Sequence, residues 1–105
     1  MPLDITTIRS FAADDKIALK RHTILRMRQR KIAADEIKEA LLNGTLIEEY
    51  PADRPLPSGL VLGYTGKGKT IHAVVAVDED EPMLWVITVY EPNPTEWEEG
   101  FEKRR

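Results

Sequence analysis

The spacing of apolar residues changes once along this chain, near Thr45. Before that point, apolar residues recur every three or four positions, as they do on the buried side of an amphipathic helix. After it come short runs rich in β-branched and aromatic residues, separated by proline, glycine or acidic clusters. These runs are TLIEEY, LVLGY, TIHAVVAV and MLWVITVY. Helices followed by strands predict an α+β fold.

Four helical segments are expected around these strands. Asp4 has the side chain of an N-cap for the first helix, and Gly44 is placed to close the third. The expected helices span residues 4–15, 20 or 22 to 30, 34–43 and 94–101, and residues 16–19 form a short extended piece. Because the strands follow one another closely, we expect N-terminal helices on one face of a four-stranded antiparallel sheet, with a short C-terminal helix.

The length of 105 residues favours a single domain, residues 1–105. Within it, residues 1–15 are expected to form an N-terminal helical extension and residues 16–105 the α+β core. The absence of cysteine excludes disulfides, thiolate metal sites and cysteine nucleophiles. No apolar run approaches roughly 20 residues and no signal-peptide pattern is present, so we expect a cytoplasmic protein without a membrane partner.

The net charge of -3 hides a separation of positive and negative residues. The segment from Lys16 to Ala34 carries seven cations and no acid, whereas residues 78–81 and 91–102 are strongly acidic. This segregation is compatible with a local anion-binding face, and equally with a solvated helix surface.

The stretch GYTGKGKT, residues 63–70, matches the phosphate-loop pattern G-x-x-x-x-G-K-[ST]. A phosphate loop needs a helix after it, because the positive end of that helix points at the phosphates. The residues that follow, IHAVVAV, are strand-like instead. We therefore interpret the stretch as a β-hairpin turn, whose Lys67 and Lys69 are candidate contacts to nucleic-acid phosphate.

The candidate catalytic residues come from a helix and two strands. His22, Arg26 and Arg30 are spaced four residues apart and line one face of the second helix. If Ile71, Ala73, Val75 and Val77 face the helices, His72 lies on the opposite face of the sheet; both faces are fairly apolar, so the choice of inward face stays open. Tyr90 is expected on the face that also carries Leu84, Val86 and Thr88. Two alternatives stay open: a hydrogen-bonded structural role for His72, and a hydroxyl at the sheet rim for Tyr90.

These residues do not form the motifs of several common enzymes. There is no recognisable Ser/His/Asp motif, no histidine pair at metal spacing and no dinucleotide fingerprint, so no metal and no cofactor is predicted. The set suits metal-free RNA cleavage, which needs an acid, a base and cations for the charged phosphorane. His22, His72 and Tyr90 are the candidate acids and bases, Arg26 is the candidate phosphate clamp, and Arg30 is a candidate nucleic-acid contact.

A series of short motifs from Lys16 onward resembles one family of small bacterial and archaeal proteins. The motifs are HxxxRMxxRxI from His22, ALLNG from Ala40, IEEYP from Ile47, PSxLxLG from Pro57, His72, and ITVYxP from Ile87 with Trp97. They closely resemble domain-of-unknown-function family 4258, although Ala33 stands where such sequences often carry a hydroxyl N-cap.

That family resembles RelE-like, BrnT-like and MqsR-like toxins of toxin–antitoxin systems, which share a helical pair, an antiparallel sheet and a C-terminal helix. The resemblance implies a ribonuclease toxin with a small zinc-finger antitoxin as its partner. The matching polar motif positions are His22, Arg26, Arg30, His72 and Tyr90.

Two hypotheses about function follow. The leading one is a toxin-like, metal-independent endoribonuclease whose acidic C-terminal tract meets a basic antitoxin surface. The alternative is a non-catalytic binding module that docks a partner protein or nucleic acid through the basic helix face. In a third interpretation, His22 and Arg26 hold the helix to the sheet and have a structural role only.

Overall fold

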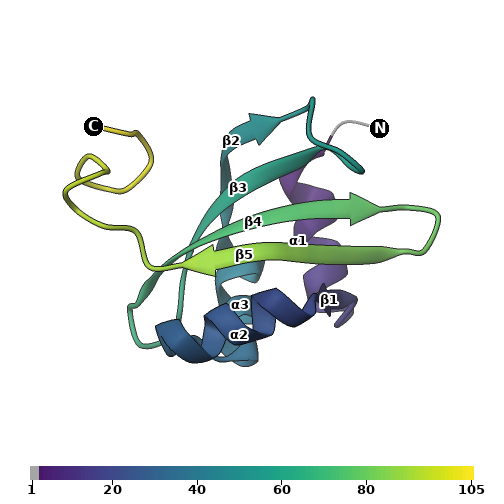
Figure 1. Ribbon diagram of the computed structural model, residues 1–105, viewed down its shortest axis with the longest axis horizontal. Helices are drawn as coiled ribbons and strands as arrows, with labels where there is room; N and C mark the ends of the chain where they lie inside the picture. The colour runs from purple at the N-terminus through teal and green to yellow at the C-terminus, as the bar shows by residue number, and fades with distance from the viewer. Residues whose placement is uncertain (1–2) are drawn as a thin grey trace.

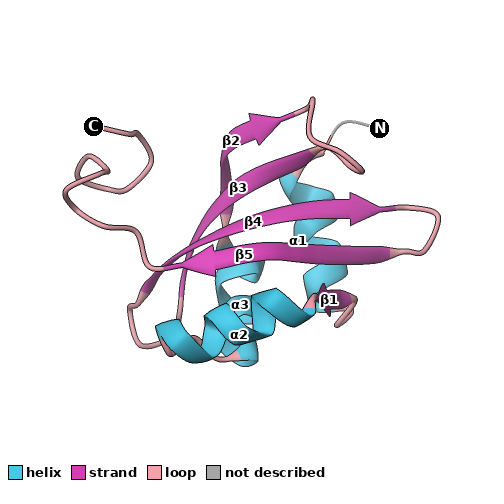
Figure 2. Cartoon of the chain, in the orientation of Figure 1, coloured by secondary structure: helices cyan, strands magenta, loops and turns pink. Residues whose placement is uncertain are grey.

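The computed structural model describes residues 3–105. Up to Tyr90, its helices and strands follow one another in the order expected from the sequence. Figures 1 and 2 show the sheet in front of helices α1 and α3, with α2 running along one edge. The elements are α1 (Ile5–Ala13), β1 (Ile17–Leu19), α2 (Arg21–Arg30), α3 (Ala34–Asn43), β2 (Thr45–Tyr50), β3 (Ser58–Tyr64), β4 (Thr70–Asp78) and β5 (Met83–Tyr90).

The sheet has five strands in the order β1-β5-β4-β3-β2. Strands β2 to β5 pair antiparallel with their sequence neighbours, but β1 pairs parallel with β5, placing Ile17 opposite Leu84 and Leu19 opposite Val86. The expected four-stranded antiparallel sheet is therefore wrong, and the sheet is mixed. A three-residue strand shows no period of its own, and its partner lies more than 60 residues away in sequence, so local patterning could not place it.

The expected C-terminal helix is also wrong. Residues 91–105 form turns and bends, with one isolated bridge between Trp97 and Arg104. Gly100 and Phe101 both have positive φ angles, 89° and 60°, which a right-handed helix cannot contain. The segment instead doubles back, because the Glu98 N–H donates to the Lys103 carbonyl at 2.8 Å.

The main core lies between the sheet and helices α1 and α3. It is built from apolar side chains of both layers that are almost fully buried, including Ile8, Ile37, Leu41, Val61, Val75, Leu84 and Val86. Helix α3 approaches β3 so closely that a Cβ on Gly63 would stand 2.0 Å from the Ala40 carbonyl oxygen. Only glycine fits there, which explains one of the glycines in the GYTGKGKT stretch.

A bulge in β5 changes which of its side chains face the helices. Val74 pairs with Thr88 and Val75 with Val86, so Ile87 is an extra residue on β5. As a result Val89 joins Leu84 and Val86 in the core, and Tyr90 lies on the opposite face. We call this the outer face. The prediction that Tyr90 shares a face with Leu84 and Val86 is wrong, because simple alternation does not survive a bulge.

The GYTGKGKT stretch forms the predicted hairpin. Strand β3 ends at Tyr64 and β4 begins at Thr70, and the Thr65 N–H donates to the Lys69 carbonyl at 2.9 Å across the turn. Gly68 supplies the positive φ angle of 84°. The residues after Thr70 continue as a strand, so the helix that a phosphate loop requires is not formed.

Candidate functional site

Helix α2 lies along the part of the β5 edge that β1 leaves unpaired in residues 3–105. Strand β1 pairs only with residues 84–86 of β5. Further along, the Thr23 hydroxyl lies 3.1 and 3.0 Å from the carbonyl oxygens of Val86 and Ile87, and Arg30 Nη1 donates to the Val89 carbonyl at 2.8 Å. Two side chains seven residues apart thus replace the missing strand and fix α2 at both ends.

The solvent side of α2 carries a row of nitrogen-rich side chains. We call His22, Arg26 and Arg30 the α2 basic face; all three are exposed, and the helix contains no acidic residue. Arg26 Nη1 donates to the Gln29 side chain at 3.2 Å, a contact in solvent. Eight residues separate His22 from Arg30, which corresponds to roughly 12 Å along the helix axis. The row can therefore span an extended anion but cannot close on one atom.

His72 lies under a cover on the outer face and is 0% exposed. Its Nδ1 is 3.3 Å from the Tyr90 hydroxyl and its Nε2 is 2.9 Å from the Phe101 carbonyl oxygen. Because a carbonyl can only accept, we assign the proton to Nε2, and Nδ1 then accepts from the Tyr90 O–H. Both ring nitrogens are occupied, as in the structural alternative considered for His72.

The cover over His72 is supplied by the C-terminal segment, residues 91–105. The buried Trp97 ring meets the His72 ring edge-on, with centroids 4.5 Å apart. The guanidinium of Arg104 lies 4.6 Å from the Trp97 ring centroid and makes two hydrogen bonds to the Glu48 carboxylate, at 3.0 and 3.1 Å. Hydrogen bonding from Arg104 is the main cause that lowers the pKa of Glu48.

Burial sets the protonation state of the histidine–tyrosine pair. It lowers the pKa of His72, although the Phe101 carbonyl opposes the shift, and it raises the pKa of Tyr90. At neutral pH the imidazole is therefore neutral and the phenol protonated. The positive charge of Arg104 opposes the shift of the Tyr90 pKa, and Arg30 acts in the same direction as Arg104. Arg30 is bonded to the carbonyl of Val89, the residue before Tyr90.

The two lysines of the hairpin differ in their surroundings. Lys69 Nζ forms an ion pair with Glu36 at 3.0 Å and donates to the Lys31 carbonyl at 3.1 Å, so it ties the turn to the start of α3. Lys67 is exposed. Glu36 also accepts from the Ala33 N–H at 2.9 Å, which compensates at this helix start for the missing hydroxyl cap.

The predicted site residues thus fall into two groups. His72, Tyr90 and the end of Arg30 lie near one another where β5 ends, whereas His22 lies at the other end of α2. Sequence reasoning missed Glu48, Trp97, Phe101 and Arg104 as neighbours of His72. The available signal was a tryptophan within an acidic tail.

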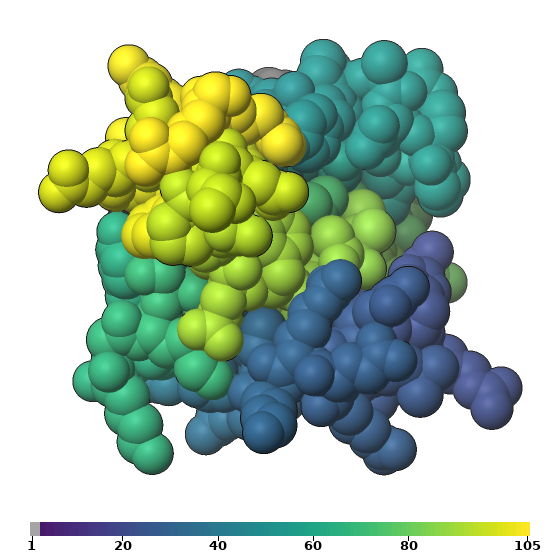
Figure 3. Space-filling view, turned by 60° about the vertical axis from the view of Figure 1, so that its left-hand side comes forward, coloured from purple at the N-terminus to yellow at the C-terminus, as the bar shows by residue number. Residues whose placement is uncertain are grey.

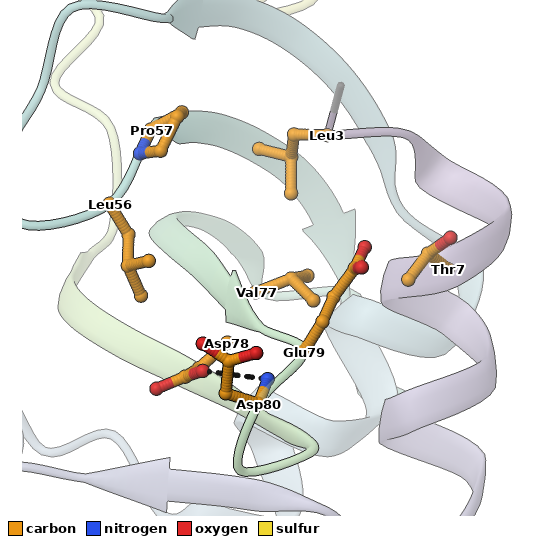
Figure 4. A pocket seen from close by; sticks show the side chains of 8 residues that line it. All are labelled: Leu3, Thr7, Leu56, Pro57, Val77, Asp78, Glu79 and Asp80. Carbon is orange, nitrogen blue, oxygen red and sulfur yellow. Dashed lines mark hydrogen bonds between the residues drawn. The ribbon is translucent and has the colours of Figure 1, made fainter. Parts of the chain in front are cut away.

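A separate pocket of about 270 Å³ carries the acidic turn between β4 and β5. Figure 4 shows Leu3, Leu56 and Val77 lining it together with Asp78, Glu79 and Asp80. Asp78 Oδ1 accepts from the Asp80 backbone N–H at 3.1 Å, so the turn uses one carboxylate for its own backbone. Among residues 3–105, no three His, Asp or Glu side chains are grouped so that they could hold a metal ion.

The fold and site together define an α+β protein with a basic helix along the edge of a mixed sheet. A profile of the family described as Domain of unknown function (DUF4258) matches residues 19–91, which is more than half of the chain, and the protein belongs to this family. The match begins at β1 and ends after β5, so it leaves out α1 and most of the C-terminal segment. Searches of curated proteins and of solved structures gave no match.

Within residues 3–105, every helix is too short or too polar to cross a membrane.

Proposed function

We propose that the protein binds single-stranded RNA through the α2 basic face. The observation that carries this proposal is the exposed row of His22, Arg26 and Arg30 on a helix without acids, fixed along the sheet edge. Arginine suits phosphate because its planar fork donates two hydrogen bonds at once. A rigid row about 12 Å long offers successive phosphates a preorganised set of donors.

The position of Tyr90 favours RNA, rather than an acidic protein surface, as the ligand of the α2 basic face. The Tyr90 ring is partly exposed on the outer face, and Arg30, at the end of the α2 basic face, donates to the carbonyl of the preceding residue, Val89. Proteins that bind single strands combine a positive track for the backbone with aromatic rings on which bases stack. The same two features meet here where α2 and β5 end.

Binding is tested by titrating a fluorescent single-stranded RNA at several salt concentrations. The logarithm of the affinity should fall linearly with the logarithm of salt, with a slope of about −0.7 per phosphate contacted. Arg26→Ala should weaken binding and reduce the size of that slope by about the contribution of one contact. Lys103→Ala removes an exposed cation of the C-terminal segment and serves as the matched control.

The proposal fails if the wild-type protein binds RNA without salt dependence, or if Arg26→Ala and Lys103→Ala behave alike. A large drop in melting temperature for Arg26→Ala would instead favour a structural role for that residue. Replacing His22 by Gln tests its protonation: a binding module that reads phosphate with its arginines keeps most of its affinity.

A second candidate function is metal-independent cleavage of the bound RNA, as in a toxin-like endoribonuclease. It is favoured by the contact between the Tyr90 hydroxyl and His72 Nδ1, with Arg30 nearby. In this mechanism Tyr90 takes the proton of a ribose 2′-hydroxyl while passing its own proton to Nδ1 of His72. The 2′-oxygen then attacks the phosphorus, Arg30 holds the phosphorane charge, and water protonates the leaving 5′-oxygen, because His22 lies too far along α2 to act on the same phosphate.

Cleavage is tested by incubating the protein with RNA in EDTA, with and without ribosomes, and by its effect on growth when expressed. Tyr90→Phe keeps the ring but removes the hydroxyl, so product formation and growth arrest should both be lost while RNA binding remains. Cleavage that survives Tyr90→Phe contradicts the mechanism. Absence of cleavage by the wild type, also after removal of any bound antitoxin, contradicts the activity and leaves the binding proposal intact.

A further inference from the structure

A second cavity, of about 410 Å³, opens on the outer face beside the start of α2. It lies between the loop of residues 51–57 and strands β4 and β5, and its size falls within the roughly 300–1,000 Å³ typical of ligand pockets. Figure 3 shows the surface of the strands set back between this loop and helix α2. The cavity is lined by none of the candidate residues for RNA cleavage, which are His22, Arg26, Arg30, His72 and Tyr90.

The floor of the cavity is apolar and partly aromatic. Ala76 and Trp85 are direct neighbours across β4 and β5, and Ile87, the bulge residue, extends the floor towards α2. Trp85 is only half-buried, so part of its ring is open to a group that enters the cavity. Pro55 and Leu56 form the facing wall, so a flat ring would be held between two apolar surfaces.

Charged groups of both signs stand around this floor. Lys20 Nζ lies 5.8 Å from the centroid of the Trp85 ring, and Arg54 lines the cavity from the opposite loop. Asp53 and Asp78 line it as well. Ser58 donates to Oδ2 of Asp53, and the turn after β4 uses Oδ1 of Asp78. Each carboxylate has a second oxygen that accepts no hydrogen bond from residues 3–105.

We propose that this cavity binds an unpaired RNA base that carries an exocyclic amino group, with cytosine as the best fit. The ring stacks on Trp85, a carboxylate of Asp78 or Asp53 accepts from the amino group, and Lys20 and Arg54 meet the flanking phosphates. Aromatic rings and carboxylates recognise bases in this way: stacking is indifferent to sequence, and an Asp acceptor selects the amino group of cytosine. Uracil presents a carbonyl there and is repelled.

The cavity continues the track of the α2 basic face. Lys20 is the N-cap residue of α2, directly before the helix that carries His22 and Arg26. A strand with one base on Trp85 therefore has its next phosphates at the start of this face. The inference rests on the proposed RNA binding and specifies where a base, rather than a phosphate, is recognised.

The experiment compares a short oligocytidylate with inorganic polyphosphate, which offers the charge without bases. Trp85→Ala should weaken oligocytidylate binding about ten-fold, the usual effect of losing one stacked base, and leave polyphosphate binding unchanged. Trp85→Phe keeps a ring and should restore most of the affinity. Tyr64→Ala, which removes another exposed aromatic on the β3–β4 hairpin, is the matched control and should have no effect.

Base selectivity tests the carboxylate. The wild type should prefer oligocytidylate over oligouridylate about five-fold, and Asp78→Asn should reduce this preference, because the amide can donate to uracil. Equal binding of both oligonucleotides by the wild type, or equal loss of both RNA and polyphosphate binding in Trp85→Ala, overturns the base site. Cytidine monophosphate binding as tightly as the oligonucleotide overturns the assignment to an RNA strand.

Failure of the proposed function gives a different pattern from failure of the base site. If neither RNA nor polyphosphate binds, the α2 basic face does not bind phosphate. A titration with cytidine alone, followed by the NMR signal of the Trp85 indole N–H, then tests whether the cavity binds a base. A change in the chemical shift of this signal supports the base site, and an unchanged shift contradicts it. If polyphosphate and RNA bind alike in wild type and Trp85→Ala, the phosphate track stands and the base site falls.

Discussion

The two faces of the sheet are covered in different ways. On the inner face, helices α1 and α3 cover an apolar core that includes Ile8, Leu41 and Val75, each fully buried. On the outer face, the end near His72 is covered by a segment without regular structure that carries Trp97 and Arg104. The other end contains the Trp85 cavity, which the loop of residues 51–57 lines on one side.

This difference indicates that the inner face contributes mainly to stability and the outer face to ligand recognition. The apolar side chains of the inner face stabilise the fold through their burial, and they present no polar group that could contact a ligand. The outer face buries a histidine that must be hydrogen-bonded and leaves aromatic rings and charges at its surface. Recognition is therefore expected outside the main core, next to the α2 basic face.

The largest effect is expected from a cavity in the inner core. Leu41→Ala should lower the free energy of unfolding by about 2–5 kcal/mol, because Leu41 is fully buried between α3 and the sheet. Urea denaturation measures this loss. The neighbouring Leu42→Ala, whose side chain is 40% exposed, is the matched control and should cost less than about 1 kcal/mol. Equal losses would mean that α3 does not carry the core.

A smaller and more local effect is expected on the outer face. Trp97→Ala removes the ring that covers His72, but the C-terminal segment can detach while the inner core stays folded. The amide of Glu98, bonded to the Lys103 carbonyl, should exchange with solvent at least about ten-fold faster, which corresponds to about 1.4 kcal/mol. Amides of β3 should stay protected. Loss of protection throughout the sheet would show that the two faces fold as one unit.

Acidification should weaken the outer face before the inner one. Burial lowers the pKa of His72, so the unfolded chain binds its proton at a higher pH than the folded protein does. The stabilisation is complete above the unfolded value of about 6.5 and is lost as the pH falls towards the folded pKa. Urea denaturation at pH 7.5 and 5.5 should show a decrease for the wild type and a smaller one for His72→Gln. A pH dependence that is unchanged in His72→Gln would contradict this explanation.

The smallest effect is expected from the Glu48–Arg104 ion pair. The Arg104 side chain is 60% exposed, so solvent screens the pair. A double-mutant cycle with Glu48→Gln and Arg104→Gln should give a coupling energy of about 0.2–1 kcal/mol, and less at high salt. A coupling of several kcal/mol would mean that the segment is held by charge rather than by the Trp97 ring.

Much of the fold could be predicted from local pattern. The bounds of α3, β2 and β5 are those expected, and the hairpin at GYTGKGKT was recognised from the strand that follows it. Alternation along β4 separates His72 from Ile71, Ala73 and Val75, but which of the two faces is the inner one could not be decided from two fairly apolar faces. For the site, the row on α2 was predicted because helical spacing is regular.

The remaining features depended on contacts distant in sequence. Alternation misplaced Tyr90 because the extra residue at Ile87 is visible only when β4 and β5 are paired. The helix expected at residues 94–101 was replaced by turns that place the Phe101 carbonyl on His72. Trp97 stands out in its acidic tail, but no local pattern shows that it covers His72, and the Trp85 cavity has no signature in the segments that line it.

Up to Tyr90, the sequence by itself determined which segments are helices and which are strands, because periodicity and local conformational preference act over a few residues. It also determined that the cations of α2 share one side, since 3.6 residues per turn follow from the backbone alone. Only the tertiary structure decided that β1 extends the sheet, that His72 is buried beside Tyr90, and that Trp85 floors a cavity next to Lys20. These are pairings between distant segments, and they form because each buries apolar surface or satisfies a polar group that its own neighbours leave unpaired.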